Sequence, residues 1–381
     1  MIRIIITFLF YTFILLNSNL IADEKLRVGL LAPFTGKYKN LGDSLLLSTQ
    51  LALDEIDNKN IIIIPKDSGS DDKVKLNASI KEIIASGTKI IIGPMTASSF
   101  TELEKYNEAI FISLSNKEPK ISKNVINIGI SLESQLETLE KFLVSNKRNK
   151  TIILYPKNNY EKFIDKKIKH LNSNKFRVFK YSTDPRILTG EIEKLTKYKK
   201  RKDNLKNKKN ILKKQDDEKS KKELKTLDKL YTLGSVDFDS IIIIDFGSSL
   251  KSVLASLIYS DVDDKEVLYT TVNQWFDKSL FHENSVKDLY FPSVDMMQFK
   301  KHNEKYYKTF GLKPDEINIL AYDALGLIHY VWKRNKEIKS INDFFINQKI
   351  KGKIGTFEFK NNKVSQQLKI YKTAGNKFKE Y

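Results

Sequence analysis

The sequence predicts an α/β fold with two lobes, each built around a parallel sheet. Two observations predict it. Short apolar runs alternate with amphipathic helical stretches along most of the chain, and polar turn residues separate them. The chain is also 381 residues long and 41% hydrophobic, which is enough for two separate cores.

The stretch from Leu26 to Asp57 shows this pattern most clearly. Its apolar start, which ends at Pro33, predicts a buried parallel strand. Apolar residues at helical spacing then predict a helix with Asp43 or Ser44 near its cap. The loop between them, Pro33 to Gly42, follows the carboxyl end of the strand, where open α/β sheets hold their ligands.

Later strands are predicted from short apolar runs, most of which are followed by polar loops. These strands span 61–65, 89–92, 109–113, 151–155, 176–181, 241–244 and 267–270. The predicted helices span 74–86, 132–144, 161–171, 250–259, 298–310 and 317–334. Such a rhythm is typical of right-handed connections between parallel strands.

One segment, 191–229, does not follow the alternation. It is dense in lysine, carries spaced leucines and contains no Gly or Pro, which favours an exposed pair of helices over a coil. Within it, 197–222 holds thirteen Lys or Arg against four acidic residues, a net charge of +9. Two interpretations stay open: a helical packing spacer, or a docking surface for an acidic partner or a membrane face.

Charge and composition restrict the function further. The net charge of +19 is unevenly distributed, and neither a nucleic-acid-binding motif nor interleaved aromatic residues accompany the basic segment. We therefore expect a solvated basic surface and no nucleic-acid partner. Cysteine is absent, which removes disulfides, thiolate chemistry and a cysteine-linked lipoprotein anchor.

Met1 to Ala22 is predicted to be an export signal. Arg3 supplies the positive start, 4–16 is a mostly apolar run, and Ser18 and Ala22 are small residues suited to cleavage. Because this run is shorter than the roughly 20 residues of a stable membrane span, a signal peptide is favoured over a transmembrane helix. An uncleaved anchor with the same outward topology is the alternative. In both cases we expect a periplasmic protein without a membrane span after this segment.

The sequence contains no complete catalytic motif, and we expect neither enzyme activity nor a cofactor. The four histidines have no metal-binding spacing, and Thr35-Gly36-Lys37 lacks the other residues of a Walker A loop. Ser248 and Lys251 have the Ser-x-x-Lys spacing of serine β-lactamases and penicillin-binding proteins, and Lys372-Thr373-Ala374-Gly375 nearly matches their Lys-Thr-Gly, but the Ser-Asp-Asn element is missing.

Taken in order, the motifs resemble those of type I periplasmic binding proteins, the leucine/isoleucine/valine-binding family. Pro33-Phe34-Thr35-Gly36, followed by Gly42-Asp43, matches the opening strand–loop–helix of that family. The segment 299–314, with Ala321-Tyr322-Asp323-Ala324 after it, resembles the late segment that returns to the first lobe. Gly352, Gly355, Phe357 and Phe359 resemble its closing strand pair.

The resemblance implies two Rossmann-like lobes with parallel sheets, joined by a hinge that the chain crosses three times. The first lobe would comprise 23–129 and 292–336, and the second 130–291 and 337–381. The basic insertion 191–229, followed by 233–239, resembles a branch of alphaproteobacterial proteins similar to penicillin-binding protein activators.

The same resemblance implies a ligand cleft between the lobes, where helix N-termini and hydroxyl groups make the polar contacts. The expected ligand-binding residues are Thr35, Gly36, Ser98, Ser99, Ser115 and Asn116 from the first lobe, and Tyr160, Ser248, Asn273 and Trp275 from the second. Helix capping is an alternative role for each Ser and Asn, and hinge packing is one for Trp275.

At four positions the chain departs from the family's amino-acid binders, which hold the ligand's carboxylate with Ser and Thr and its ammonium with Tyr and Glu. At or near the places of that Ser, Thr, Tyr and Glu, this chain has Ala97, Lys117, Ser248 and Asn273, respectively. An ammonium without a facing carboxylate loses a charge-assisted hydrogen bond, which weakens capture of a leucine-like amino acid.

We therefore expect a non-catalytic periplasmic protein that binds a small polar solute or a partner and acts as a penicillin-binding protein activator-like regulator of cell-wall synthesis. The alternative is the substrate-binding component of an ABC importer for amino acids or related metabolites. The partner would be a peptidoglycan synthase in the first case and an ABC permease in the second.

Overall fold

The computed structural model describes residues 25–95, 100–116, 123–169, 171, 174–215, 217–282, 286–346, 348–360 and 363–381. The predicted export signal, Met1 to Ala22, and two predicted site residues, Ser98 and Ser99, lie outside the described residues. The chain divides into two compact units: unit 1 comprises 1–114, 121–126 and 321–344, and unit 2 comprises 115–120, 127–320 and 345–381. Among the helices of the described residues, none is both long and apolar enough to cross a bilayer.

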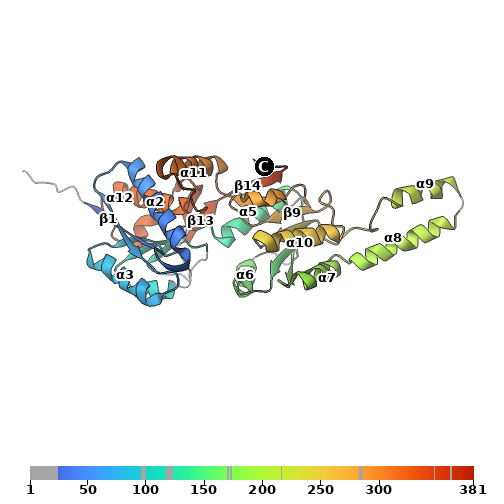
Figure 1. The fold of residues 1–381 in the computed structure, drawn as a ribbon, viewed down its shortest axis with the longest axis horizontal. Helices are drawn as coiled ribbons and strands as arrows, with labels where there is room; N and C mark the ends of the chain where they lie inside the picture. The colour runs from blue at the N-terminus through green and yellow to red at the C-terminus, as the bar shows by residue number, and fades with distance from the viewer. Residues whose placement is uncertain are drawn as a thin grey trace, which may run out of the picture. The chain divides into compact units, whose positions relative to one another are not determined.

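Unit 1 is an α/β unit built on a five-stranded sheet in the order β2-β1-β3-β4-β5 (Figure 1). The pairs β1–β2, β1–β3 and β3–β4 are parallel. Its strands are β1 (Leu26–Ala32), β2 (Ile61–Asp67), β3 (Ile90–Ile92), β4 (Ile110–Ser113) and β5 (Val125–Asn127). Its helices are the 3-10 helices η1 (Gly36–Tyr38) and η4 (Ile341–Phe344), α2 (Lys39–Ile56), α3 (Lys73–Ala85), α4 (Phe100–Leu103) and most of α12 (Ile319–Asn335).

The first helix of unit 1 starts earlier than the sequence predicts. α2 begins at Lys39, four residues before the predicted cap at Asp43. Asp43 lies inside the helix and forms an ion pair with Lys39 one turn earlier. The helix therefore uses this carboxylate on its surface, and Tyr38 stands at its N-terminus without a side-chain cap.

Unit 2 contains a seven-stranded sheet in the order β15-β14-β10-β9-β8-β6-β7. The strands β7, β6, β8, β9 and β10 are parallel, and β14 and β15 continue the sheet antiparallel. The strands are β6 (Thr151–Pro156), β7 (Phe176–Tyr181), β8 (Ser240–Ile243), β9 (Leu268–Thr271), β10 (Tyr290–Ser293), β14 (Lys369–Ala374) and β15 (Lys377–Glu380). A separate antiparallel sheet consists of β11 (Lys349–Lys351), β12 (Thr356–Lys360) and β13 (Lys363–Gln367).

The helices of unit 2 cover both faces of the larger sheet, which explains why its central strands are apolar without interruption. Ile152 and Leu154 of β6 belong to a core with α7 (Pro185–Leu195) and α10 (Gly247–Tyr259). Ile153 and Tyr155, on the opposite face, belong to a core with α5 (Leu132–Ser145) and α6 (Glu161–Ile168). The α/β class predicted from the sequence is confirmed, because buried parallel strands need apolar residues on both sides.

Residues 292–320 lie in unit 2, whereas the sequence-based boundary assigned 292–336 to the first lobe. Contacts at the start of α11 (Met296–Phe310) show why this part stays with the sheet of unit 2. The backbone N–H of Met296 donates to the hydroxyl of Tyr371 on β14 at 3.0 Å, and Asp295 pairs with Lys369 at 3.1 Å. β10, which the sequence analysis did not predict, also joins this sheet.

The lysine-rich segment folds into two helices, α8 (Tyr198–Lys213) and α9 (Glu218–Leu227), which extend away from the sheet of unit 2 (Figure 1). We call residues 197–229 the basic hairpin. Its helices share a small core of leucines, namely Leu205, Leu212, Leu224, Leu227 and Leu233. The leucine spacing that predicted a helical pair thus serves to join the two helices to each other.

A buried arginine anchors the basic hairpin to the body of unit 2. Arg201 is only 6% exposed, and its guanidinium donates to the carbonyls of Thr196 and Asp261 at 3.0 Å and to the carbonyl of Ser260. It also donates to the hydroxyl of Thr232 at 3.0 Å. Burial lowers the pKa of Arg201, while the charge of Asp261 opposes that shift. The guanidinium thus satisfies several carbonyls that would otherwise be buried without a donor.

Replacing this arginine should loosen the root of the basic hairpin. In Arg201→Met, the carbonyls of Thr196, Ser260 and Asp261 lose their donor, which costs about 1–3 kcal/mol for each buried group left unsatisfied. We expect trypsin to cleave within residues 197–229 at least about tenfold faster than in the wild type, because local opening becomes more frequent. The matched control is Lys200→Met, which removes an exposed neighbouring cation and should leave the rate unchanged. Equal rates in both variants would contradict the anchoring role.

Candidate functional site

The clearest cavity lies within unit 2, at the carboxyl end of its parallel strands. It has a volume of about 330 Å³ and is bounded by the ends of β6, β8 and β9 together with the first turns of α5 and α6. The chain moves from β6 to β7 on one side and then continues with β8 and β9 on the other side of β6, so the strand order reverses between β6 and β8. Ligands of open α/β sheets bind at such a switch point.

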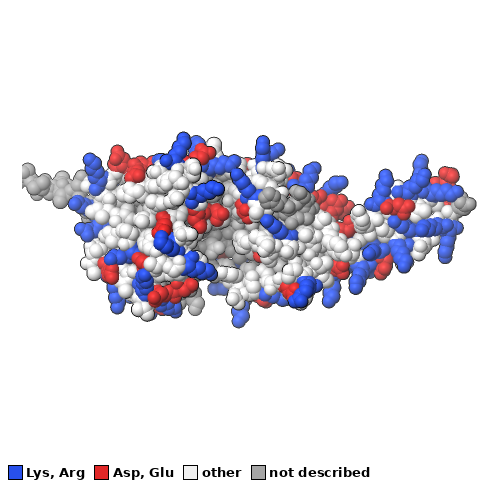
Figure 2. All heavy atoms as spheres, in the orientation of Figure 1, with Lys and Arg blue, Asp and Glu red and all other residues white. Residues whose placement is uncertain are grey.

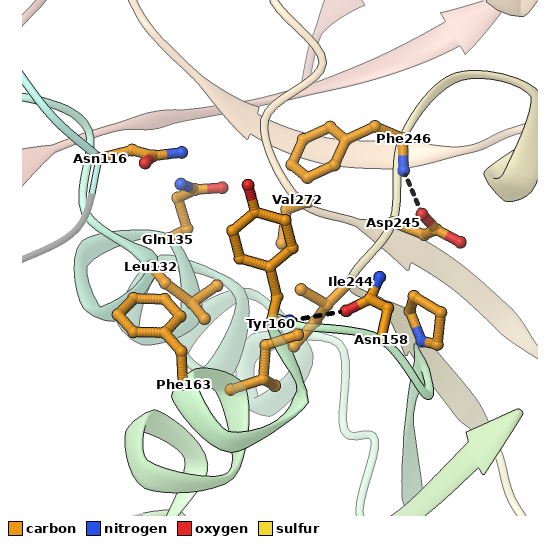
Figure 3. Close-up of a pocket in the computed structure, with 12 residues that line it drawn as sticks. Asn116, Leu132, Gln135, Asn158, Tyr160, Phe163, Ile244, Asp245, Phe246 and Val272 are labelled. Carbon is orange, nitrogen blue, oxygen red and sulfur yellow. Dashed lines mark hydrogen bonds between the residues drawn. The ribbon is translucent and has the colours of Figure 1, made fainter. Parts of the chain in front are cut away.

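The lining of this cavity is mostly apolar and aromatic. The apolar part consists of Leu132, Pro156, Ile164, Ile244 and Val272. All of these except Pro156 also belong to the hydrophobic core between the sheet and helices α5 and α6. Three aromatic side chains, Tyr160, Phe163 and Phe246, stand around it (Figure 3). Tyr160 is 51% exposed and Phe246 is 55% exposed, so both rings remain accessible to a ligand.

The polar part of the lining is formed by amides. Gln135 accepts a hydrogen bond from the backbone N–H of Asn273 at 2.8 Å and donates to the carbonyl of Ile130 at 3.3 Å. Asn158 accepts from the backbone N–H of Tyr160 at 2.8 Å, which shapes the loop before α6. Asn116 completes the set (Figure 3). Such groups orient a ligand through neutral hydrogen bonds.

Asp245 is the one charged residue among the twelve described residues that line the cavity. One carboxylate oxygen accepts from the backbone N–H of Phe246 at 2.8 Å, and the other accepts from the hydroxyls of Tyr181 and Ser249. Figure 3 shows the carboxylate turned toward the backbone of Phe246, whereas the ring of Phe246 extends toward the cavity. The carboxylate of Asp245 therefore fixes the backbone of Phe246 in the cavity wall, at the N-terminus of α10, where the helix dipole favours an anion.

Tyr181 holds this carboxylate from the neighbouring core. Burial raises the pKa of the Tyr181 hydroxyl far above its ordinary value, and the charge of Asp245 raises it further. The phenol consequently stays protonated and donates its hydrogen bond to Asp245. Asp245 and Tyr181 thus form a fixed pair that positions Phe246.

Two predicted residues, Tyr160 and Asn116, line the cavity. Asn116 was expected in the first lobe, but residues 115–120 belong to unit 2. Ser248 is exposed in the first turn of α10 and is not part of the lining. The side-chain oxygen of Asn273 accepts from the backbone N–H of Trp275 at 3.0 Å and from the hydroxyl of Ser293 at 2.8 Å. Asn273 therefore builds the turn after β9, and its backbone rather than its amide reaches Gln135.

Ser115 and Trp275 are not among the described residues that line the cavity. Ser115 is buried, at 5% exposed. Trp275 is half-buried, has a positive φ of 49° and packs near the ring of Phe299 at 6.0 Å between centroids. This contact with α11 lies within unit 2, and the alternative of hinge packing stays a prediction.

The two predicted residues described in unit 1 form a network of their own at the carboxyl ends of β1 and β2. The hydroxyl of Thr35 donates to Asp67 at 2.6 Å and accepts from the ammonium of Lys75 at 2.9 Å. Gly36 has a φ of +77°, and a Cβ there would lie 2.7 Å from the hydroxyl oxygen of Ser70. The loop after β1 is thus tied to the loop after β2.

Asp67 is the centre of that network. Burial by itself would raise the pKa of Asp67, but hydrogen bonds from Lys75, Thr35 and the backbone N–H groups of Gly69 and Phe34 outweigh it and hold the pKa well below its usual range. The carboxylate therefore stays charged and orders both loops.

Sequence reasoning missed most of the cavity's lining, although one signal pointed to part of it. Asp245 and Phe246 directly follow the predicted strand 241–244, so the rule that strand ends hold ligands would have included them. Gln135 and Phe163 lie inside predicted helices, where their spacing suits a core position as well as a site. Only the tertiary contacts of these residues distinguish a site position from a core position.

Two residues of the incomplete catalytic motifs, Lys372 and Thr373, have structural contacts. Lys372 pairs with Asp288 at 3.0 Å, and the hydroxyl of Thr373 accepts from the backbone N–H of Leu289 at 3.0 Å, so both lie in the antiparallel part of the sheet. Within the described part of the chain, no group of three or more His, Asp or Glu side chains is placed to hold a metal ion.

Comparison with known proteins supports a binding-protein fold. Residues 25–169 match the model of a family described as periplasmic binding protein. The C-domain of LpoA (YraM) from Haemophilus influenzae, described as a regulator of PBP1A, superposes with a TM-score of 0.61 at 13% identity, covering 93% of this chain and 99% of that one. A structure assigned to a branched-chain amino acid ABC transporter of Rhodospirillum rubrum gives a TM-score of 0.70 at 12% identity, covering 94% and 100%.

The chain has the fold of the type I periplasmic binding proteins. A sequence relative agrees with the leucine-binding type: the Leu/Ile/Val-binding protein BraC3 of Rhizobium johnstonii is 26% identical over 147 residues. That match covers 35% of this chain and 40% of the relative, so it spans less than half of the curated protein. The structural neighbours include both a protein described as a regulator of PBP1A and a structure assigned to a branched-chain amino acid ABC transporter.

Proposed function

We propose that this protein is a non-catalytic, periplasmic ligand-binding protein whose cavity in unit 2 accepts an uncharged group, and that it regulates a peptidoglycan synthase. The observation that carries the proposal is the cavity's lining. Its aromatic rim and three amides suit a neutral group with apolar and hydrogen-bonding parts, and the oxygens of its one carboxylate, Asp245, already accept from Tyr181, Ser249 and Phe246.

An amino acid fits this cavity poorly. Its ammonium would need a carboxylate partner to gain a charge-assisted hydrogen bond, and Asn273 is engaged with Ser293 and Trp275. Its carboxylate would gain nothing from the nearby negative charge of Asp245. The second candidate, a substrate-binding component of an ABC importer, is favoured by the TM-score of 0.70 to the Rhodospirillum rubrum structure.

Thermal unfolding with matched ligands separates the two candidates. N-acetyl-leucinamide and N-acetyl-phenylalaninamide carry the side chain between two neutral amides, whereas leucine and phenylalanine carry both charges. We expect the capped compounds to raise the melting temperature, since a ligand at a hundredfold excess over its Kd stabilises by about 2.7 kcal/mol. A rise with free leucine and none with the capped compounds would overturn the proposal in favour of import.

Variants show whether the response comes from the cavity. Tyr160→Ala combined with Phe246→Ala removes two exposed rings and should abolish the shift, because each ring buries apolar area on the ligand. Tyr330→Ala, which removes an exposed aromatic residue of unit 1, is the control and should keep the shift in melting temperature.

The regulatory part is tested by adding the protein to a purified peptidoglycan synthase from the same organism, with stimulated glycan polymerisation as the expected result. No change in polymerisation would remove the synthase from the proposal.

A further inference from the structure

The basic hairpin carries most of its charge outward. α8 contains seven Lys and one Arg against one Asp. Figure 2 shows the corresponding end of unit 2 covered by cationic side chains over much of its surface. The exposed lysines are Lys197, Lys199, Lys200, Lys202, Lys206, Lys213, Lys214, Lys219, Lys221, Lys222, Lys225 and Lys229.

Three acidic residues of the hairpin, Asp217, Glu223 and Asp228, serve its internal structure. Lys208 pairs with Glu223 at 3.0 Å and Lys209 pairs with Asp228 at 3.1 Å, and both pairs join α8 to α9. Asp217 caps α9 by accepting from the backbone N–H of Ser220 at 2.8 Å. With the leucine core and the buried Arg201, these contacts hold the hairpin as an ordered projection that presents its lysines to solvent.

The chemistry of this surface fits a diffuse anionic surface better than an acidic protein. Protein interfaces favour Arg and aromatic residues at a packed centre and are depleted in Lys. Here the outward cations are lysines, which are hydrated point charges without the bidentate geometry of Arg. They also occur on both helices rather than on one packed face, and Ile211, at 55% exposed, is the exposed apolar residue of α8.

We propose that the basic hairpin docks unit 2 onto a membrane surface rich in anionic phospholipid headgroups. Lysines near such a surface each contribute on the order of 1 kcal/mol, without needing a shaped pocket. The predicted export signal would bring the chain to such a surface. The docking does not depend on what the cavity binds, so the two proposals can fail separately.

Vesicle flotation tests this directly. The full-length protein is mixed with vesicles of phosphatidylcholine alone, or of equal parts phosphatidylcholine and phosphatidylglycerol, and the bound fraction is measured. We expect binding that requires phosphatidylglycerol and is lost in high salt, because salt screens charges between exposed groups. Replacing Lys199, Lys202, Lys206, Lys213, Lys214 and Lys222 by Gln should weaken this binding at least about tenfold.

The control variant loses the same number of positive charges outside the basic hairpin. It replaces six exposed lysines by Gln, namely Lys59, Lys81, Lys89, Lys141, Lys301 and Lys308. It should bind like the wild type. Equal weakening in both variants would show an effect of net charge alone and overturn the proposal. Equal binding to both kinds of vesicle, or binding to poly-L-glutamate without binding to vesicles, would overturn it as well, the latter in favour of an acidic protein partner.

Discussion

Gly42→Ala is expected to destabilise unit 1 by about 2 kcal/mol or more, although alanine is normally the better helix former. A Cβ at position 42 would lie 2.2 Å from the carbonyl oxygen of Pro33 and 2.6 Å from its carbonyl carbon. These are backbone atoms at the start of the loop that carries Thr35 and Gly36. Either α2 or this loop must move, which disturbs the network around Asp67.

The matched control is Gly326→Ala, in α12 of unit 1, where a Cβ meets nothing within 4 Å. This variant should gain about 0.5–1 kcal/mol, because alanine loses less conformational entropy in a helix. The chain has two tryptophans, and Trp332 lies in unit 1 whereas Trp275 lies in unit 2. In a Trp275→Phe background, urea unfolding followed by Trp332 fluorescence therefore reports on unit 1. An unchanged midpoint for Gly42→Ala would show that the close approach to Pro33 is absent in solution.

The second large effect is expected for Asp67→Asn, which should cost unit 1 about 2 kcal/mol at neutral pH. The side chain of Asp67 is 16% exposed and pairs with Lys75 at 2.5 Å, while Phe34 and Gly69 donate backbone hydrogen bonds at 2.8 and 2.9 Å. Asparagine keeps the shape but loses the charge that strengthens all of these bonds.

The loss should depend on pH in a defined direction. Because the folded state holds the pKa of Asp67 below its unfolded value, the carboxylate contributes stability that is fully present above that unfolded value, about 3.9. The contribution shrinks as the pH falls from there toward the lower folded pKa. We therefore expect a constant difference between wild type and Asp67→Asn above about pH 5, which narrows in more acidic solution.

The measurement is the free energy of unfolding of both proteins between pH 7 and pH 3, again with Trp332 as the probe. Asp71→Asn is the control, since Asp71 is an exposed carboxylate in the same loop and its loss should change stability by less than about 0.5 kcal/mol. A difference that widens in acid would mean that Asp67 is not held in its charged form by this network.

The class of fold could be predicted from the sequence because its signal is local. Each buried strand needs apolar residues on both faces, as in β6 and β8, and each covering helix needs an apolar stripe, so the alternation is visible in the order of residues alone. The helical pair in the basic segment is visible for the same reason, since its leucines recur at helical spacing.

The candidate site could be predicted only in part. Tyr160 and Asn116 were among the residues that the family resemblance placed at a cleft, and both line the cavity, because loops at the ends of parallel strands share one edge of the sheet. Gln135 and Phe163 were not among them, because they lie inside helices, where nothing in the local sequence separates a cavity lining from a core position. Among the residues that were expected to bind, Thr35 and Asn273 are engaged with partners from other loops.

What the sequence by itself determined is therefore the alternation of strands and helices, the position of the loops and the composition of the basic hairpin. What only the tertiary structure decided is which polar groups remain available: Asp245 is taken by Tyr181, 64 residues away, and Asn273 by Ser293. Buried positions repeat along the chain with the period of a helix or strand, so they can be read from the sequence. Hydrogen-bond partners are often distant in the sequence, because they depend on which donors and acceptors the fold brings together.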